Sequence, residues 1–414
     1  MRCRLRSVSL AIVLGTAVSV QAQTSDQEKD PAPRTRAEIL DRQREAKADE
    51  LAPYVVSKAE ERVHFIETWR LPFRLLQKGV GGFRPVLGGL PSGSGFVGGG
   101  GYITGYNSDL LQFTANARFS TRDFQAYDAG LLIFPRTNSL LPVEGYARAG
   151  LRDFASVRFF GLGEGAPPDR TTYRLEDRTF ELGLNAWAGR FAELGGGVQW
   201  LTSETGSGGE GFSLEERFDP ISIPGFGVET DFFRYGGGGA IHLREESVDP
   251  SVGMTFRFDV HRYDDRNSAA FDFTRAVGEV QAHIPIVHRN RIVALRVRTS
   301  HSLGEHGGTV PFHLMETLGG AASIRGFREY RFRDTRNIVV NAEYRWEVWT
   351  YADFAVFYDG GKVFSDASDL DFSNLESGYG FGIRGHGPGG AVMRFDFAWS
   401  REGFIWHIGS GPSF

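Results

Sequence analysis

The segment at residues 322–334 reads Ala-Ser-Ile-Arg-Gly-Phe-Arg-Glu-Tyr-Arg-Phe-Arg-Asp. It lies in a long connection between two segments in which apolar and polar side chains alternate, and further alternating segments follow it up to Phe414. Alternation with a period of two predicts β-strands that have one apolar face and one polar face. This part of the chain therefore predicts an all-β fold.

The composition excludes several classes of protein. The 414 residues include 54 glycines, 34 phenylalanines and one cysteine, and the net charge is −5. A sequence pI near 6.1 lacks the basic footprint of a nucleic-acid-binding protein. The mean hydropathy of −0.26 is compatible with a membrane β-barrel, because a barrel shows only alternate residues to lipid.

Residues 1–22 have the pattern of a secretory signal peptide. Three arginines precede an apolar stretch at residues 8–20, and residues 20–22 (Val-Gln-Ala) place small side chains at the cleavage positions. The apolar stretch is too short to span a bilayer as a helix. We expect an exported protein that has no cysteine after cleavage, because Cys3 lies within the signal.

Residues 23–84 are expected to form a short periplasmic arm. Residues 23–35 are polar and proline-containing, which predicts disorder. Charged and apolar residues then mix at helical spacing over 36–51 and 55–68, with a break at Pro53.

Residues 85–414 are predicted to form a transmembrane antiparallel β-barrel of about sixteen strands. Clear alternation occurs at residues 111–119, 254–261, 293–298 and 393–399. A β-sandwich would show the same alternation, but the connections favour a barrel, because tight turns and long loops alternate in barrels. Short turns are expected near Thr121, Asp153, Gly189, 246–249, 288–290, Thr350 and 387–389, and longer connections at 161–172, 203–229, 301–331 and 363–376.

The last strand is predicted to carry a C-terminal assembly signal. Phe404, Trp406, Ile408 and Phe414 share one parity, and a terminal aromatic residue is typical of outer-membrane barrels. We therefore expect a bacterial outer-membrane location, with both termini in the periplasm.

Four motifs occur in order in the C-terminal part of the chain. They are Leu318-Gly319-Gly320 leading to Ile324-Arg325-Gly326-Phe327, then Asn341-Ala342-Glu343-Tyr344-Arg345, Phe357-Tyr358-Asp359-Gly360-Gly361 and Gly378-Tyr379-Gly380-Phe381-Gly382-Ile383-Arg384. With these motifs the chain resembles the bacterial surface antigen family, the BamA/TamA-like superfamily of outer-membrane assembly and translocation barrels.

The resemblance implies that the Arg325-Gly326-Phe327 loop folds into the lumen and that its arginine pairs with a strand carboxylate. Period two places Glu343, Phe357 and Asp359 on inward faces, where a guanidinium can pair with carboxylates and stack on an aromatic ring. Gly326 would allow loop and wall to approach closely. Two interpretations remain open: the pair is a structural strut, or the strut also serves function.

The resemblance also implies a lateral gate between the first and last strands. The first strand is expected at Ser92–Tyr102, where Gly98, Gly99 and Gly100 weaken it. The last strand carries Gly409 and Gly411. The alternative is that these glycines relieve crowding where the barrel curves tightly.

The chain departs from the best-known members of the family in its N-terminal arm. That arm is too short for a polypeptide-transport-associated (POTRA) domain, so the chain resembles the subgroup without such domains. We predict a protein that assists insertion or translocation of proteins or lipids, without enzymatic activity or cofactors. Its expected partners are outer-membrane lipids, nascent outer-membrane proteins or a periplasmic protein. The alternative is a passive channel or a structural surface antigen.

Other candidate sites are weak. The histidines at 301 and 306 do not have the spacing of a zinc protease site, so we expect no metal. The chain has no Gly-x-Ser-x-Gly motif for a lipase, and His407 has no evident serine partner.

Overall fold

The computed structural model describes residues 35–50, 79–105, 108, 110–134, 142–245, 250–286, 290–349, 352–387, 390–411 and 413–414. The chain divides into two compact units, Met1–Trp69 and Arg70–Phe414. The first contains α1 (Arg36–Glu50), which confirms the helix predicted to begin at Arg36. None of the helices in the described ranges is long and apolar enough to cross a membrane.

Several predictions for the N-terminal region fall outside the described residues. These are the signal peptide at 1–22, nearly all of the segment predicted to be disordered, and the second helix at 55–68.

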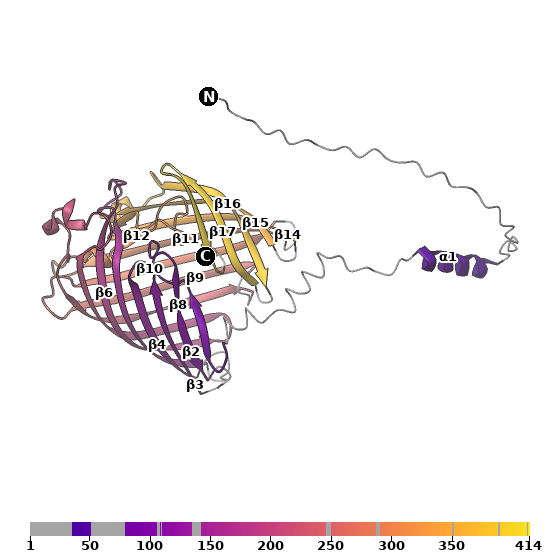
Figure 1. Ribbon diagram of the computed structural model, residues 1–414, viewed down its shortest axis with the longest axis horizontal. Helices are drawn as coiled ribbons and strands as arrows, with labels where there is room; N and C mark the ends of the chain where they lie inside the picture. The colour runs from indigo at the N-terminus through magenta and orange to yellow at the C-terminus, as the bar shows by residue number, and fades with distance from the viewer. Residues whose placement is uncertain are drawn as a thin grey trace, which may run out of the picture. The chain divides into compact units, whose positions relative to one another are not determined.

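The second unit contains a 16-stranded antiparallel sheet in which neighbours in the chain pair with each other (Figure 1). Its strands are β1 (Phe83–Leu87), β2 (Val97–Thr104), β3 (Leu111–Ser120), β4 (Phe124–Ile133), β5 (Val143–Phe159), β6 (Thr171–Ala188), β7 (Ala192–Ser207), β8 (Thr230–Arg244), β9 (Gly253–Asp265), β10 (Phe273–Pro285), β11 (Arg291–Gly304), β14 (Arg336–Trp349), β15 (Ala352–Phe364), β16 (Glu376–Gly387), β17 (Gly390–Ser400) and β18 (Gly403–Gly409). The predicted number of about sixteen strands is confirmed.

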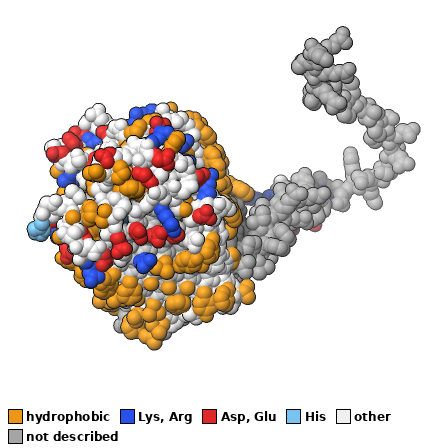
Figure 2. All heavy atoms as spheres, turned by 60° about the vertical axis from the view of Figure 1, so that its left-hand side comes forward, with side chains coloured by type: hydrophobic (Ala, Val, Ile, Leu, Met, Phe, Trp, Pro, Cys, Tyr) orange, Lys and Arg blue, Asp and Glu red, His pale blue; other side chains and the backbone are white. Residues whose placement is uncertain are grey.

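The alternation of side chains along each strand gives the sheet two different faces. In β15, Phe354, Val356 and Tyr358 are exposed, whereas Phe357 and Asp359 between and beside them are buried. The outer face is rich in exposed apolar residues, and Figure 2 shows hydrophobic side chains gathered beside a region of mixed charge. The predicted parity of the C-terminal strands therefore holds in the structure.

The two ends of the sheet carry different connections. One end, which we call the loop end, carries the connections at 160–170, 208–229, 305–335 and 365–375. The other end, the turn end, carries the connection at 189–191, and there β15 follows closely on β14. The four longest connections therefore all lie at the loop end, as predicted, but the short turns at 121–123 and 401–402 lie there as well.

One of the predicted turns is wrong, and another lies at the opposite end of the sheet from the one expected. No turn occurs at Asp153, because β5 continues through it to Phe159. The carboxylate of Asp153 instead accepts two hydrogen bonds from Arg174 on β6, at 3.0 and 2.8 Å. The turn at Thr121 exists, but it joins β3 to β4 at the loop end.

The prediction that Ser92–Tyr102 is the first strand is also wrong. A five-residue strand, β1, precedes it and pairs along its length with the glycine-rich β2. Among the described residues, β1 pairs with β2 alone and β18 with β17 alone. The edges of the sheet are therefore β1 and β18, and Gly98, Gly99 and Gly100 lie one strand in from the edge.

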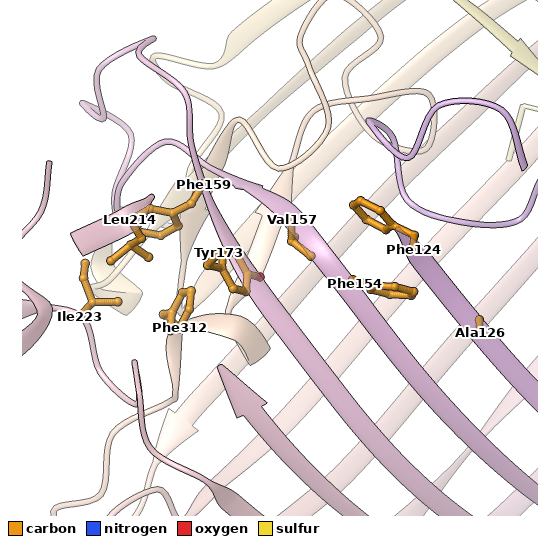
Figure 3. Close-up of a cluster of buried hydrophobic side chains, with 9 residues drawn as sticks. All are labelled: Phe124, Ala126, Phe154, Val157, Phe159, Tyr173, Leu214, Ile223 and Phe312. Atoms are coloured by element: carbon orange, nitrogen blue, oxygen red, sulfur yellow. The ribbon is translucent and has the colours of Figure 1, made fainter. Parts of the chain in front are cut away.

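The sheet curls around the connection at 305–335, which we call the inner loop. This segment contains η3 (Phe312–Leu314) and a small two-stranded sheet of β12 (Glu316–Leu318) and β13 (Phe332–Asp334). Apolar side chains of the inner loop, of the connection at 208–229 and of β5 and β6 form a buried cluster at the loop end (Figure 3). Phe312 of η3 belongs to this cluster and contacts the rings of Phe159 and Tyr173.

Candidate functional site

The inner loop brings Arg325 into the interior of the sheet. Gly319 and Gly320 precede it with φ of 113° and 81°, a region that glycine adopts without strain. This turn is closed by a hydrogen bond from the N–H of Gly320 to the carbonyl of Phe327, at 2.8 Å. The result is a compact turn that carries Arg325 at its tip, with its side chain only 2% exposed.

Arg325 binds the carboxylate of Asp359 on β15 through two nitrogen atoms. Its Nε lies 2.7 Å from one carboxylate oxygen of Asp359, and its Nη2 lies 2.8 Å from the other. The backbone N–H of Arg325 donates to the same carboxylate at 3.1 Å. Asn341 on β14 supports this carboxylate with its side-chain amide, at 2.8 Å. This is bidentate guanidinium–carboxylate geometry, which orients both partners.

The remaining nitrogen of Arg325 and its planar face are also occupied. Its Nη1 donates to Glu343 on β14 at 2.6 Å, and its guanidinium carbon lies 3.4 Å from the centre of the Phe357 ring. Burial alone lowers the pKa of a guanidinium, but the carboxylates of Asp359 and Glu343 outweigh burial and raise the pKa of Arg325. Arg325 is therefore a charged group that contacts the wall through three side-chain nitrogens and one face of its guanidinium.

A larger buried charge network surrounds this contact. Glu343 also receives a hydrogen bond from Arg384 on β16 at 2.9 Å, and one from Arg345 at 2.9 Å. Arg384 in turn lies 2.7 Å from Asp396 on β17. The network contains four guanidinium groups and three carboxylates, none more than 8% exposed: Arg325, Arg345, Arg384, Arg394, Glu343, Asp359 and Asp396. Buried charges of this kind persist only when each finds a partner.

The two residues after Arg325 anchor the loop in different ways. A Cβ on Gly326 would lie 2.7 Å from the carbonyl oxygen of Trp399 and from the Cβ of Ser400, so only glycine fits against β17. The carbonyl of Gly326 accepts a hydrogen bond from the Ser400 hydroxyl at 2.6 Å. Phe327 is fully buried in an apolar cluster with Leu318, Ile324, Phe332, Val339 and Val363.

The inner loop also contacts both edge regions of the sheet. On the β18 side, His407 lies 2.6 Å from the carbonyl oxygen of Arg325. Nearby, Arg331 donates to Glu402 in the β17–β18 turn at 2.5 Å. On the β1 side, the carboxylate of Glu329 accepts a hydrogen bond from the N–H of Ser92 at 2.6 Å. One short segment therefore bridges the last hairpin and the turn between β1 and β2.

Arg333 fixes the inner loop to a third part of the wall. Its side chain is 2% exposed and donates to the carbonyl of Phe312 at 2.5 Å. Its guanidinium carbon lies between 5.7 and 5.9 Å from the ring centres of Phe159, Tyr173, Phe312 and Tyr330. Cation–π contact with aromatic rings is stabilising for a desolvated guanidinium, so this residue ties the inner loop to β5 and β6.

The structure brings together Arg325, Phe357, Asp359 and Glu343, and it adds members that the sequence analysis did not select. The alternation along β16 and β17 places the charges of Arg384 and Asp396 on the inner face, and this signal could have identified them from the sequence. The contacts of the inner loop with Ser92, Glu402 and His407 join distant parts of the chain, and no local pattern marks them.

The terminal residues are placed differently from the prediction. Phe404, Trp406 and Ile408 are exposed on the outer face of β18. The expectation that Phe414 shares this face is wrong, because β18 ends at Gly409 and the Phe414 ring lies 5.8 Å from the inward-facing Arg345. Gly411 likewise follows the strand.

Within the described residues, no group of three or more histidine, cysteine or acidic side chains could hold a metal ion. His301 contacts the hydroxyl of Thr299.

Comparison with known proteins finds a family match for the C-terminal part of the sheet and a structural match for most of the chain. Residues 229–411 match the model of the Omp85 superfamily domain. The solved structure of BamA from Haemophilus ducreyi lacking POTRA domains 1-3 is similar at a TM-score of 0.58 and 13% identity, covering 80% of this chain and 68% of that one. CdiB from Escherichia coli has a TM-score of 0.49 at 12% identity, covering 79% and 60%. No curated protein matches the chain.

Proposed function

Residues 229–411 of this chain are an Omp85 superfamily domain, and from that premise we propose that the protein is an outer-membrane β-barrel assisting insertion or translocation of proteins or lipids. The resemblance seen in the four sequence motifs is confirmed at the level of the superfamily. The observation that carries the proposal is the inner loop, which is bound to the interior wall through Arg325 and also contacts both edge regions of the sheet.

The surface supports a membrane location. Along β9, Met254, Phe256, Phe258 and Val260 are all exposed on the outer face. Exposed apolar surface of this extent is rare on soluble proteins and is expected where a barrel faces lipid. The turn end would then face the periplasm, with the loop end outside.

The seam between β1 and β18 is the proposed gate. Strand β1 has five residues and β18 has seven, so a ladder between them would contain few hydrogen bonds. Pro85, in the middle of β1, has no N–H to donate. The glycines Gly98, Gly99 and Gly100 lie in β2, and we propose that they make this neighbour of the edge strand easy to deform.

The inner loop would hold the seam from inside. Its contact with Glu402 restrains the last hairpin, and its contact with Ser92 restrains the turn after β1. Opening the seam would therefore require that the inner loop, held by the Arg325 network, releases either the turn after β1 at Ser92 or the last hairpin at Glu402 and His407. By this reading the strut and the functional element are the same structure.

The proposed partners are outer-membrane lipids and nascent outer-membrane proteins that reach the seam, or a periplasmic protein that delivers them. Binding of such partners would use the apolar outer faces of the edge strands. On β1 these are Phe83 and Leu87, 69% and 63% exposed, and on β18 Trp406 is 59% exposed. Side chains this apolar at an unpaired edge need a lipid or protein neighbour.

A passive channel is the rival function, and the apolar cluster at the loop end argues against it. Phe159, Tyr173, Leu214, Ile223 and Phe312 are at least 95% buried there (Figure 3). We propose that this cluster, which packs η3 and the connection at 208–229 against β4, β5 and β6, narrows the path for water at that end. Steady conductance of the purified protein in a planar bilayer would favour the channel.

Photo-crosslinking at the edges tests the proposed function. A photoreactive residue would replace Leu87 on β1 or Trp406 on β18, with Phe258 in the middle of the wall as the matched exposed control. Capture of nascent outer-membrane proteins or of lipid acyl chains at both edges, well above the control, supports the proposal. Equal capture at all three positions would refute it.

A further inference from the structure

Two arginines hold the turn between β1 and β2 at the loop end. Arg122, from the β3–β4 turn, donates to the carbonyl of Gly93 at 3.2 Å. Arg158, from the end of β5, donates to the hydroxyl of Ser92 at 3.2 Å. A Cβ on Gly93 would lie 3.1 to 3.2 Å from three atoms of the Arg158 side chain. The absence of a side chain at Gly93 therefore makes room for a guanidinium.

Two more arginines, Arg170 and Arg328, lie near the turn between β1 and β2. The Nη2 of Arg170 lies 3.7 Å from the position that a Cβ on Gly211 would occupy, and the neighbouring Glu210 pairs with Arg122. Arg328 directly precedes Glu329, whose carboxylate accepts a hydrogen bond from the N–H of Ser92, the residue whose hydroxyl Arg158 binds. These groups come from separate segments: the β3–β4 turn, the end of β5, the connection at 160–170 and the inner loop. The fold thus gathers four guanidinium groups at one rim.

The rim lies beyond the part of the sheet that a bilayer would cover. β5 has 17 residues, whereas a transmembrane strand needs about 9–11. The outward-facing ion pair between Asp153 and Arg174 marks a level already exposed to water. Arg158 lies five residues further along the strand toward the loop end.

Nearby carboxylates do not balance these charges. Glu210 lies 3.3 Å from Arg122, and Glu329 is engaged by the N–H of Ser92. In the described part of the chain, no carboxylate forms an ion pair with Arg158, Arg170 or Arg328. The Nε of Arg158 is moreover buried without a hydrogen-bond partner. Four cations thus face two carboxylates, and one donor is left unsatisfied.

An anion of a particular kind would balance this arrangement. Like charges held close together destabilise one another, and a buried donor without a partner is unfavourable. A tetrahedral oxyanion with two negative charges can accept hydrogen bonds from several guanidinium groups at once. A single carboxylate has too few oxygens and too little charge for four of them.

We propose that Arg122, Arg158, Arg170 and Arg328 form a binding site for a phosphate group, supplied by a lipid headgroup or by free phosphate. A phosphate there would link the inner loop, through Arg328, to the β3–β4 turn and to β5. The site is independent of assembly activity, so it can be tested whether or not the protein inserts or translocates a substrate.

Calorimetric titration of the purified full-length protein in detergent with inorganic phosphate tests the free-anion source. Saturable binding with a stoichiometry near one is expected, weakening as salt is raised. The double variant Arg122→Ala with Arg328→Ala should bind at least about tenfold more weakly, which corresponds to about 1.4 kcal/mol. The single variant Arg190→Ala, an exposed arginine at the turn end, should bind like wild type.

The lipid source is tested in nanodiscs of phosphatidylcholine with or without phosphatidic acid. Native mass spectrometry after detergent extraction should retain one phosphatidic acid on wild type and lose it in the double variant, while Arg190→Ala retains it. Binding in either arm supports the site and identifies the source of the phosphate. No saturable binding in both arms, or unchanged binding by the double variant, would overturn the proposal. Both replaced side chains lie at the rim outside the buried clusters, and an unchanged unfolding midpoint of the double variant verifies its fold.

Discussion

The contact between Arg325 and Asp359 is open to a double-mutant cycle. Arg325→Ala removes three side-chain hydrogen bonds to carboxylates and the stack on Phe357. It leaves Asp359 buried with the amide of Asn341 and the backbone N–H of residue 325 as its remaining donors. Asp359→Ala leaves Arg325 still bound to Glu343.

The expected magnitudes follow from these remaining partners. Breaking a buried ion pair costs about 3–5 kcal/mol. We expect Arg325→Ala to lower the free energy of unfolding by about 4 kcal/mol and Asp359→Ala by about 3 kcal/mol, because Glu343 still satisfies part of the arginine. The double variant should lose about 5 kcal/mol, so the coupling energy is about 2 kcal/mol. Solvent screening does not reduce these values, since both side chains are at least 98% buried.

Urea unfolding of the protein in lipid vesicles, followed by tryptophan fluorescence, measures all four variants. The exposed pair Arg217 and Asp169, 3.0 Å apart with side chains 34% and 70% exposed, serves as the matched control. Its coupling should be below about 1 kcal/mol. If Arg325→Ala and Asp359→Ala add to within about 0.5 kcal/mol, the proposed pairing does not stabilise the fold and the reasoning fails.

Three further predictions concern the inner loop and the seam. Gly326→Ala should lower the free energy of unfolding by about 1–3 kcal/mol, because its Cβ has no room. Gly100→Ala, with nothing within 4 Å of the new Cβ, should change it by less than about 0.5 kcal/mol; similar losses in both would contradict the packing argument. Phe312→Ala should produce steady bilayer conductance that wild type lacks, and a wild type that already conducts would disprove the apolar seal. Glu402→Gln should raise crosslinker capture at the seam, since it weakens the hold of Arg331; unchanged capture would show that this contact does not restrain the hairpin.

Much of the sheet could be predicted from the sequence, because side chains in a strand alternate whatever the strand pairs with. That rule placed Glu343, Phe357 and Asp359 on the inner face, whereas the resemblance to the surface antigen family implied that Arg325 would meet them. It failed where local composition misleads. Strand β1 is short and contains Pro85, which weakens its signal. Asp153 resembles a turn residue, but lies in a strand that continues past the predicted membrane level.

The sequence by itself determined the fold class, the number of strands and the charged partners available to the inner loop, since these depend on periodicity and residue type. Tertiary structure alone decided which groups meet. Ser92 and Glu329 are 237 positions apart, and Arg331 and Glu402 are 71 positions apart. The four rim arginines come together from separate segments in the same way. Such contacts depend on how the sheet curls around the loop, and no periodicity within a single strand carries that information.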